Sequence, residues 1–139
     1  MSERKKVGAV IISHGQLAGE LLAAAEMVVG PLDHISAVSI GWHDDVDLVK
    51  DEVERAIERV SADKGVLLLT DMFGGIPTNI AAMFLGTEGI ELVTGVNLPM
   101  ILKLATQPEE LTLVEAAQQA EERGRSAIRR AGGLLSIKG

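Results

Sequence analysis

The stretch Val7-Gly-Ala-Val-Ile-Ile-Ser-His14 decides the fold of this chain. Its uncharged run from Val7 to Ile12 is rich in β-branched side chains, which predicts a strand buried on both faces. Such strands belong to parallel sheets whose two faces are covered by helices. Ser13 and His14 follow where the strand ends, which is the edge at which open parallel sheets bind their ligands.

Apolar runs and helical patterns continue to alternate along the rest of the chain. Strands are predicted at 7–12, 35–40, 65–70 and 90–94, and helices at 16–29, 46–60, 77–85, from Asn97 onward and at 108–130. Asp44 and Asp45 stand where an N-cap and first-turn acids belong. The pattern predicts one α/β domain over residues 1–139, an open sheet of four mostly parallel strands with helices on both faces.

Composition narrows the classes of function. The 139 residues include no cysteine, which excludes disulfides and thiolate zinc sites. A formal net charge of −7 repels phosphate backbones, and only Trp42, Phe73 and Phe84 are aromatic, so nucleic acid is not an expected partner. No stretch is suited to crossing a bilayer and no cleavage site follows the first apolar run, so a cytoplasmic location is expected. No P-loop or dinucleotide fingerprint occurs, and no cofactor is expected.

Chemistry is expected where the first and third predicted strands end, at His14 and Asp71. If these strands are neighbours, the two side chains lie together at one sheet edge. A carboxylate that accepts a hydrogen bond from Nδ1–H fixes the imidazole tautomer and leaves Nε2 as a nucleophile or base. Backbone N–H groups at Gly15 and at Gly74-Gly75, ahead of a predicted helix, can hold an anion. Transient phosphorylation of a histidine requires this combination.

Two metal-dependent alternatives also fit the sequence. His43-Asp44-Asp45 could ligate a divalent cation, although a helix start with acidic capping residues is the simpler interpretation. A metal hydrolase that uses His14, His43 and Asp71 would need a stoichiometric bound metal. No metal site is therefore predicted.

Two other polar residues receive structural interpretations. His34 opens a strand and is expected to be exposed. Ser13 adjoins His14, and neighbours on a strand point to opposite faces, which disfavours a serine hydrolase. No Gly-x-Ser-x-Gly elbow is present either.

Three motifs together resemble a known family. They are Val7-Gly-Ala-Val-Ile-Ile-Ser-His14-Gly, then Gly65-Val-Leu-Leu-Leu-Thr-Asp71 with Phe73-Gly-Gly-Ile-Pro-Thr-Asn79, and Val93-Thr-Gly-Val-Asn-Leu-Pro99-Met100. In order and spacing they are similar to the enzyme IIA component of the mannose/fructose/sorbose class of the bacterial phosphoenolpyruvate-dependent sugar phosphotransferase system. The resemblance extends from residue 7 to about residue 130.

The resemblance implies a phosphocarrier. His14 would accept a phosphoryl group from the phosphohistidine of HPr and pass it to a separate enzyme IIB for sugar uptake, while Asp71 would orient the ring. It also implies a parallel α/β sheet and a homodimer in which a C-terminal strand, at about 133–138 here, crosses to the partner's sheet. Contact with the membrane would be indirect, through the transporter complex. Met72, Phe73 and Ile76 are expected to dock HPr, because exposed apolar side chains beside a strand end need a reason.

Two departures from the family pattern bear on function. Mannose-type members often carry a hydroxyl residue between the Gly-Gly pair and the proline, where this chain has Ile76. Thr78 is the candidate replacement, so the predicted phosphate-binding residues are Gly15, Gly74, Gly75 and Thr78. No attached IIB domain is expected, which leaves open a regulatory IIA-like module whose His14 phosphorylation is read by a partner protein. The IIA-like domain of dihydroxyacetone kinases usually carries a Gly-Ser-Ala-type turn, which Phe73-Gly74-Gly75 does not match.

Overall fold

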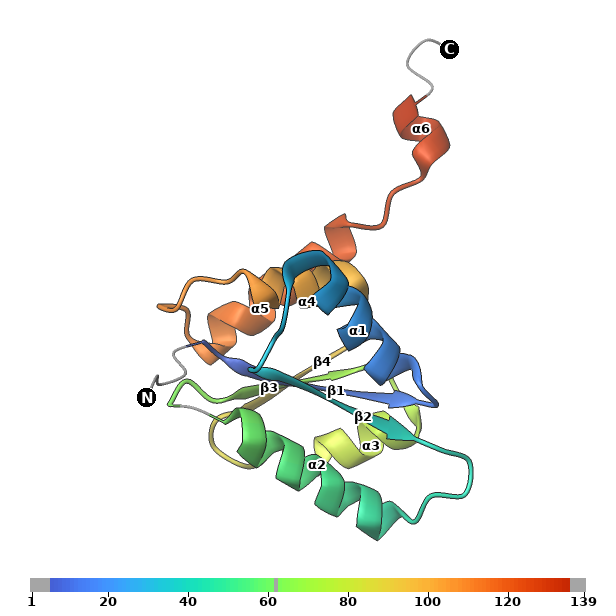
Figure 1. The fold of residues 1–139 in the computed structure, drawn as a ribbon, viewed down its shortest axis with the longest axis vertical. Coiled ribbons are helices and arrows are strands. Elements are labelled where there is room, and N and C mark those ends of the chain that lie inside the picture. The colour runs from blue at the N-terminus through green and yellow to red at the C-terminus, as the bar shows by residue number, and fades with distance from the viewer. Residues whose placement is uncertain (1–5, 62, 136–139) are drawn as a thin grey trace.

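A parallel sheet between two layers of helices forms the body of the molecule (Figure 1). The computed structural model describes residues 6–61 and 63–135. The strands are β1 (Gly8–His14), β2 (Ile35–Ile40), β3 (Val66–Thr70) and β4 (Ile90–Thr94). They lie in the order β2-β1-β3-β4, and every neighbouring pair is parallel. The predicted open sheet of four parallel strands is confirmed.

Helices cover both faces of this sheet. On one face lie α1 (Leu17–Val29), α4 (Leu98–Ala105) and α5 (Leu113–Ser126), and on the other lie α2 (Val46–Val60) and α3 (Gly75–Ala82), while α6 (Ala131–Leu135) stands apart (Figure 1). Alternate residues of β1 point into the two layers. Ala9 and Ile11 pack with α1, α4 and α5, whereas Val10 and Ile12 pack with α2 and α3. Burial on both faces explains why the strand sequence is a continuous apolar run.

Capping residues decide where two helices begin. Asp45 caps α2 as predicted, because its side chain accepts hydrogen bonds from the N–H groups of Asp47 and Leu48. The prediction that the helix at 108–130 begins at residue 108 was wrong. A capping box formed by Thr112 and Glu115 starts α5 at Leu113, and it satisfies two backbone N–H groups reciprocally.

The end of α3 and the structure of the C-terminal segment also differ from the prediction. α3 ends at Ala82 rather than at residue 85, because the next N–H groups bond to carbonyls three residues back and tighten the chain into turns. Residues 131–135 are helical, so the strand predicted at about 133–138 is not present there, and 136–138 lie outside the described residues. The N–H groups of Gly133 and Leu134 donate hydrogen bonds to the carbonyl of Arg130, so these backbone groups are paired within the segment.

Over the described residues no helix combines the length and apolar character needed to cross a membrane.

Candidate functional site

The neighbouring strands β1 and β3 bring His14 and Asp71 together. The register pairs Ile12 with Thr70, so both strands end at the same edge of the sheet. His14 ends β1 and Asp71 is the residue after β3. The two side chains that were predicted to meet if these strands were neighbours do meet.

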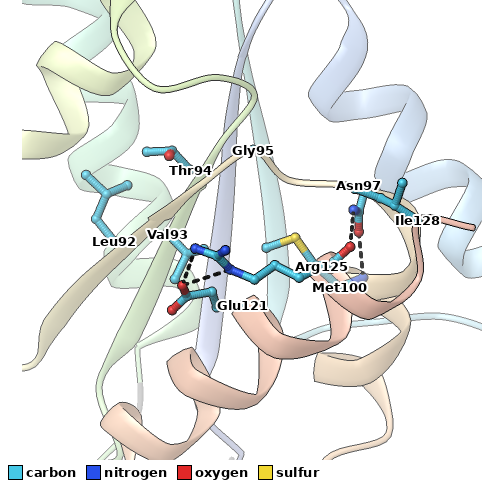
Figure 2. A pocket seen from close by; sticks show the side chains of 10 residues that line it. Leu92, Val93, Thr94, Gly95, Asn97, Met100, Glu121, Arg125 and Ile128 are labelled. Carbon is cyan, nitrogen blue, oxygen red and sulfur yellow. Dashed lines mark hydrogen bonds and ion pairs between the residues drawn. The ribbon is translucent and has the colours of Figure 1, made fainter.

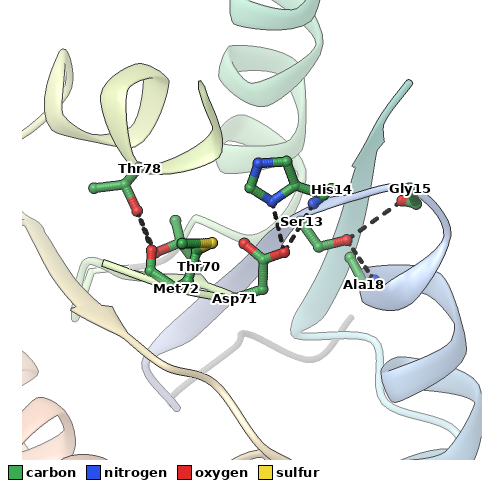
Figure 3. Close-up of polar contacts among 8 residues, drawn as sticks. All are labelled: Ser13, His14, Gly15, Ala18, Thr70, Asp71, Met72 and Thr78. Atoms are coloured by element: carbon green, nitrogen blue, oxygen red, sulfur yellow. Dashed lines mark hydrogen bonds and ion pairs between the residues drawn. The ribbon is translucent and has the colours of Figure 1, made fainter. Parts of the chain in front are cut away.

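One oxygen of Asp71 contacts His14 twice. Oδ2 accepts a hydrogen bond from the backbone N–H of His14 at 3.0 Å and lies 2.9 Å from Nδ1 of its ring (Figure 3). A carboxylate only accepts hydrogen bonds, so this contact places the proton on Nδ1. The lone pair then resides on Nε2, and the imidazole side chain is 50 % exposed. The ring is therefore held by one nitrogen and available to a reactant at the other.

The second oxygen of Asp71 is buried and has no hydrogen-bond partner among the described residues. Leaving a buried carboxylate oxygen unpaired costs free energy. The Asp71 side chain is only 12 % exposed, so its carboxylate lies poorly solvated beside the imidazole. Such a carboxylate stabilises positive charge that develops on the ring during nucleophilic attack.

Gly75 lies against the free nitrogen of the ring. A Cβ added at Gly75 would meet Nε2 at 3.2 Å and Cε1 at 3.1 Å. Gly75 is also the first residue of α3, and its φ of +83° lies in the region that favours glycine. The first N–H groups of a helix have no intrahelical acceptor, and they attract anions. Nε2 thus faces the start of a helix across a space that any larger residue would fill.

Hydroxyl groups hold the loop that carries Gly74 and Gly75. Thr78 Oγ1 donates a hydrogen bond to the carbonyl of Met72 at 2.6 Å and lies 2.9 Å from Thr70 Oγ1 (Figure 3). Both threonines are buried. The hydroxyl proton of Thr78 is therefore directed at the loop backbone. Sequence reasoning missed Thr70, whose position at the end of a strand beside Asp71 was the available signal.

The chain matches a known protein family over most of its length. The family model described as "PTS system fructose IIA component" matches residues 8–121. The chain belongs to the EIIA family of the mannose, fructose and sorbose phosphotransferase systems. The match covers both motifs that form the site, including His14 and the turn that follows Asp71.

Individual relatives agree with this membership. The mannose-specific EIIAB component of Escherichia coli K12 is 28 % identical over 125 residues, which make up 88 % of this chain and 39 % of that protein. This EIIA chain therefore spans about two fifths of that relative's length. The fructose-specific EIIA component of Bacillus subtilis 168 is 28 % identical over 108 residues, 77 % of this chain and 74 % of the relative. The solved mannose/sorbose-specific IIA subunit of Enterococcus faecalis is 31 % identical with a TM-score of 0.81, covering 90 % of this chain and 94 % of that one.

Gly15 and Ser13 of this EIIA chain bend the backbone from β1 into α1. The N–H of Gly15 donates to the carbonyl of Ile40 at 2.7 Å, and its φ is +58°. Ser13 is buried, and its hydroxyl accepts a hydrogen bond from the N–H of Ala18 at 2.7 Å (Figure 3). Ser13 and His14 thus point to opposite sides, as predicted. The Gly15 N–H, predicted as an anion donor, is engaged by the neighbouring strand.

The remaining polar candidates have structural partners. Asp44 Oδ2 accepts a hydrogen bond from the N–H of Gly41 at 2.6 Å, and Asp45 caps α2. In the part of the chain that the structure describes, no three His, Asp or Glu side chains are placed to hold a metal ion. The prediction that His34 is exposed was wrong. His34 is 6 % exposed and its Nε2 lies 3.4 Å from the carbonyl of Leu104, because the end of α4 covers the start of β2.

Proposed function

We propose that this EIIA chain is a phosphocarrier whose His14 Nε2 accepts a phosphoryl group from phosphorylated HPr and passes it to a separate enzyme IIB. The observation that carries the proposal is the 2.9 Å contact between Asp71 Oδ2 and His14 Nδ1, which leaves Nε2 unprotonated beside Gly75. Membership of the EIIA family supports the same assignment. The chain needs no cofactor for this transfer, because the reacting nitrogen and its orienting carboxylate are its own side chains.

The proposed step is a displacement at phosphorus between two imidazole rings. The lone pair of Nε2 forms a new N–P bond, and the N–P bond to the donor's histidine breaks with its electron pair returning to that ring. Positive charge grows on the His14 ring as the new bond forms, and the carboxylate of Asp71 stabilises it. Nδ1–H stays bonded to Oδ2 throughout. Transfer to enzyme IIB is the same displacement with His14 as the leaving ring.

Backbone groups of the Gly74-Gly75 turn are proposed to hold the phosphoryl oxygens. The N–H groups of Gly75 and Ile76 lie in the first turn of α3, where a helix attracts anions. Gly15 and Thr78 were also predicted to bind phosphate, but each already donates its hydrogen bond within the protein. They are proposed to support the site from behind, by fixing the chain on either side of it.

The proposal includes a homodimer tied by the C-terminal segment. Among the described residues, β4 has a strand neighbour only on its β3 side, and a groove of about 370 Å³ lies between β4 and α5 (Figure 2). Leu92 and Val93 lie in this groove. An open edge of this kind is a template for another strand. α6 stands off the body with Leu134 48 % exposed, so the segment is not packed on its own sheet (Figure 1). We propose that it is helical in the single chain and becomes extended when it pairs with a partner's β4.

Onward transfer tests the function as a whole. The chain is phosphorylated with phosphoenolpyruvate, enzyme I and HPr, freed of these components, and mixed with candidate enzyme IIB proteins encoded beside its gene. We expect the phosphoryl group to move to one IIB within seconds. A phosphorylated chain that keeps its phosphoryl group in the presence of every such IIB would instead support the regulatory module. A chain that is never phosphorylated contradicts both.

A further inference from the structure

Two exposed aromatic residues follow the ends of the strands that neighbour β1 on its two sides. Trp42 is 97 % exposed and Phe73 is 86 % exposed. Ile40, the last residue of β2, pairs with His14. Trp42 follows Ile40 by two residues, which span at most about 7 Å of extended chain. Phe73 follows β3, on the other side of β1. The strands that lead to Trp42, His14 and Phe73 therefore lie in this order across the sheet.

The loop that carries Trp42 is ordered by its own hydrogen bonds. The N–H of Gly41 donates to Asp44 Oδ2 at 2.6 Å, and Asp45 accepts from the first N–H groups of α2. Figure 1 shows this loop between β2 and α2 reaching out beyond the sheet. The loop that carries Phe73 is held by Thr78 at the carbonyl of Met72. Hydrogen bonds thus hold the backbone at both aromatic residues, whose side chains are exposed to solvent and do not pack into the core.

Exposed apolar surface of this size is costly and marks an interaction site. Met72, Ile76 and Leu17 are each about half exposed and follow the ends of β3 and β1, so they add apolar surface at the same sheet edge. Aromatic anchors of this kind dominate the binding energy of protein interfaces. The surface is too exposed to enclose a small molecule, so a protein partner fits it better.

Charge gives the chemistry of that partner. Asp44, Asp45 and Asp47 are exposed beside Trp42, and residues 41–49 contain no lysine or arginine. Glu20 adds a further exposed acid in the first turn of α1. An apolar surface bordered by acids on a chain of net charge −7 complements an apolar surface bordered by lysine and arginine.

We propose that Trp42 and Phe73 form a two-sided docking clamp for the phosphoryl donor, a small protein that presents its phosphohistidine within an apolar patch bordered by basic side chains. This inference rests on the proposed function and adds Trp42, on the β2 side, as a residue that selects the partner. Neither ring takes part in the chemical step. They hold the donor so that its phosphorus approaches Nε2 between them.

Two phosphoryl donors separate docking from chemistry. Phosphorylated HPr must dock, whereas phosphoramidate is a small molecule that reaches His14 without a protein interface. Trp42→Ala should lower the second-order rate constant for transfer from phosphorylated HPr about 10- to 100-fold, as loss of an interface anchor does. Its rate with phosphoramidate should equal that of the wild type. Met27→Ala is the matched control, because Met27 is 89 % exposed but lies ten residues into α1, about 15 Å along the helix from its start.

Binding itself can be followed because Trp42 is the only tryptophan in the chain. In His14→Gln, which cannot react, addition of HPr should shift Trp42 emission to shorter wavelength, and the shift should weaken as salt is raised. Trp42→Ala that accepts from HPr at the wild-type rate, or that loses its rate equally with both donors, overturns the clamp. A wild-type chain that takes a phosphoryl group from neither donor overturns the proposed function, and the clamp with it.

Discussion

A single oxygen of Asp71 binds both the backbone and the ring of His14. Oδ2 lies 3.0 Å from the backbone nitrogen and 2.9 Å from Nδ1. The first contact ties the end of β1 to the residue after β3, and the second fixes the tautomer. Because one atom makes both contacts, the carboxylate that holds the strand end also sets the orientation of the ring. The positions of the reacting nitrogen and of the sheet edge are thereby coupled.

Replacing Asp71 with asparagine tests the role of its charge. Asp71→Asn keeps the shape of the side chain and an oxygen that can accept both hydrogen bonds, but it removes the negative charge that stabilises the ring during attack. Transfer to His14 should slow roughly 10²- to 10⁴-fold, the range of acid–base contributions, while the fold is retained. Rapid-quench kinetics with phosphorylated HPr measures the rate. A rate within a few-fold of the wild type would mean that the carboxylate is not electrostatic support.

Two adjacent glycines provide a matched pair for the space beside Nε2. Gly75→Ala places a Cβ about where the new N–P bond must form, 3.2 Å from Nε2, whereas a Cβ at Gly74 meets nothing within 4 Å. Both residues have positive φ, +83° and +97°, so each substitution should lower the free energy of unfolding by about 1–3 kcal/mol. Only Gly75→Ala should lose phosphoryl acceptance. Chemical denaturation measures the stability of both variants, and phosphorylation assays measure their acceptance. Equal losses of acceptance in the two variants would contradict the role assigned to the space beside Nε2.

Thr78→Val distinguishes support of the loop from direct contact with phosphate. Valine has nearly the same shape but cannot donate to the carbonyl of Met72. If the hydroxyl supports the loop, the free energy of unfolding should fall by about 1–3 kcal/mol because that carbonyl loses its strong donor. Thr78→Ser retains a hydroxyl and should restore most of it. Unchanged stability together with slower transfer would return Thr78 to the role of a phosphate ligand.

Much of the fold was predictable because local patterns and tertiary structure agree. A continuous apolar run such as 7–12, rich in β-branched residues, is typical of a strand buried on both faces. Four such runs that alternate with helices predict a parallel sheet. The meeting of His14 and Asp71 depended on β1 and β3 being neighbours, which strand spacing alone does not determine. The sheet order supplied that contact.

Other features depended on contacts that the sequence does not display. His34 was expected at the surface because it opens a strand, but α4 packs over that end of the sheet. Thr78 was predicted to bind phosphate through its hydroxyl, and the sequence does not display the hydrogen bond that this hydroxyl donates to the backbone carbonyl of Met72. The start of α5 was placed at a proline and two acids, although Thr112 and Glu115 form the stronger start signal.

Truncation tests the proposed tie between subunits. Removing residues 132–139 deletes Gly132, Gly133 and the apolar run that follows them. We expect the full-length chain to be a dimer at low concentration and the truncated chain to be monomeric or aggregated, because an uncovered β4 edge invites other pairings. Light scattering reports the mass of each. A truncated chain that remains a soluble dimer would show that another surface holds the subunits together, and His14→Gln, which alters only the acceptor, should remain dimeric.

The central claim is that His14 is the acceptor, and intact mass measures it most directly. The chain is incubated with phosphoenolpyruvate, enzyme I and HPr, and its mass is recorded before and after brief acid treatment. The wild type and the His43→Gln control should each gain one phosphoryl group per chain and lose it in acid, while His14→Gln should gain none and remain folded. Full phosphorylation of His14→Gln, or an acid-stable product on the wild type, would contradict the account.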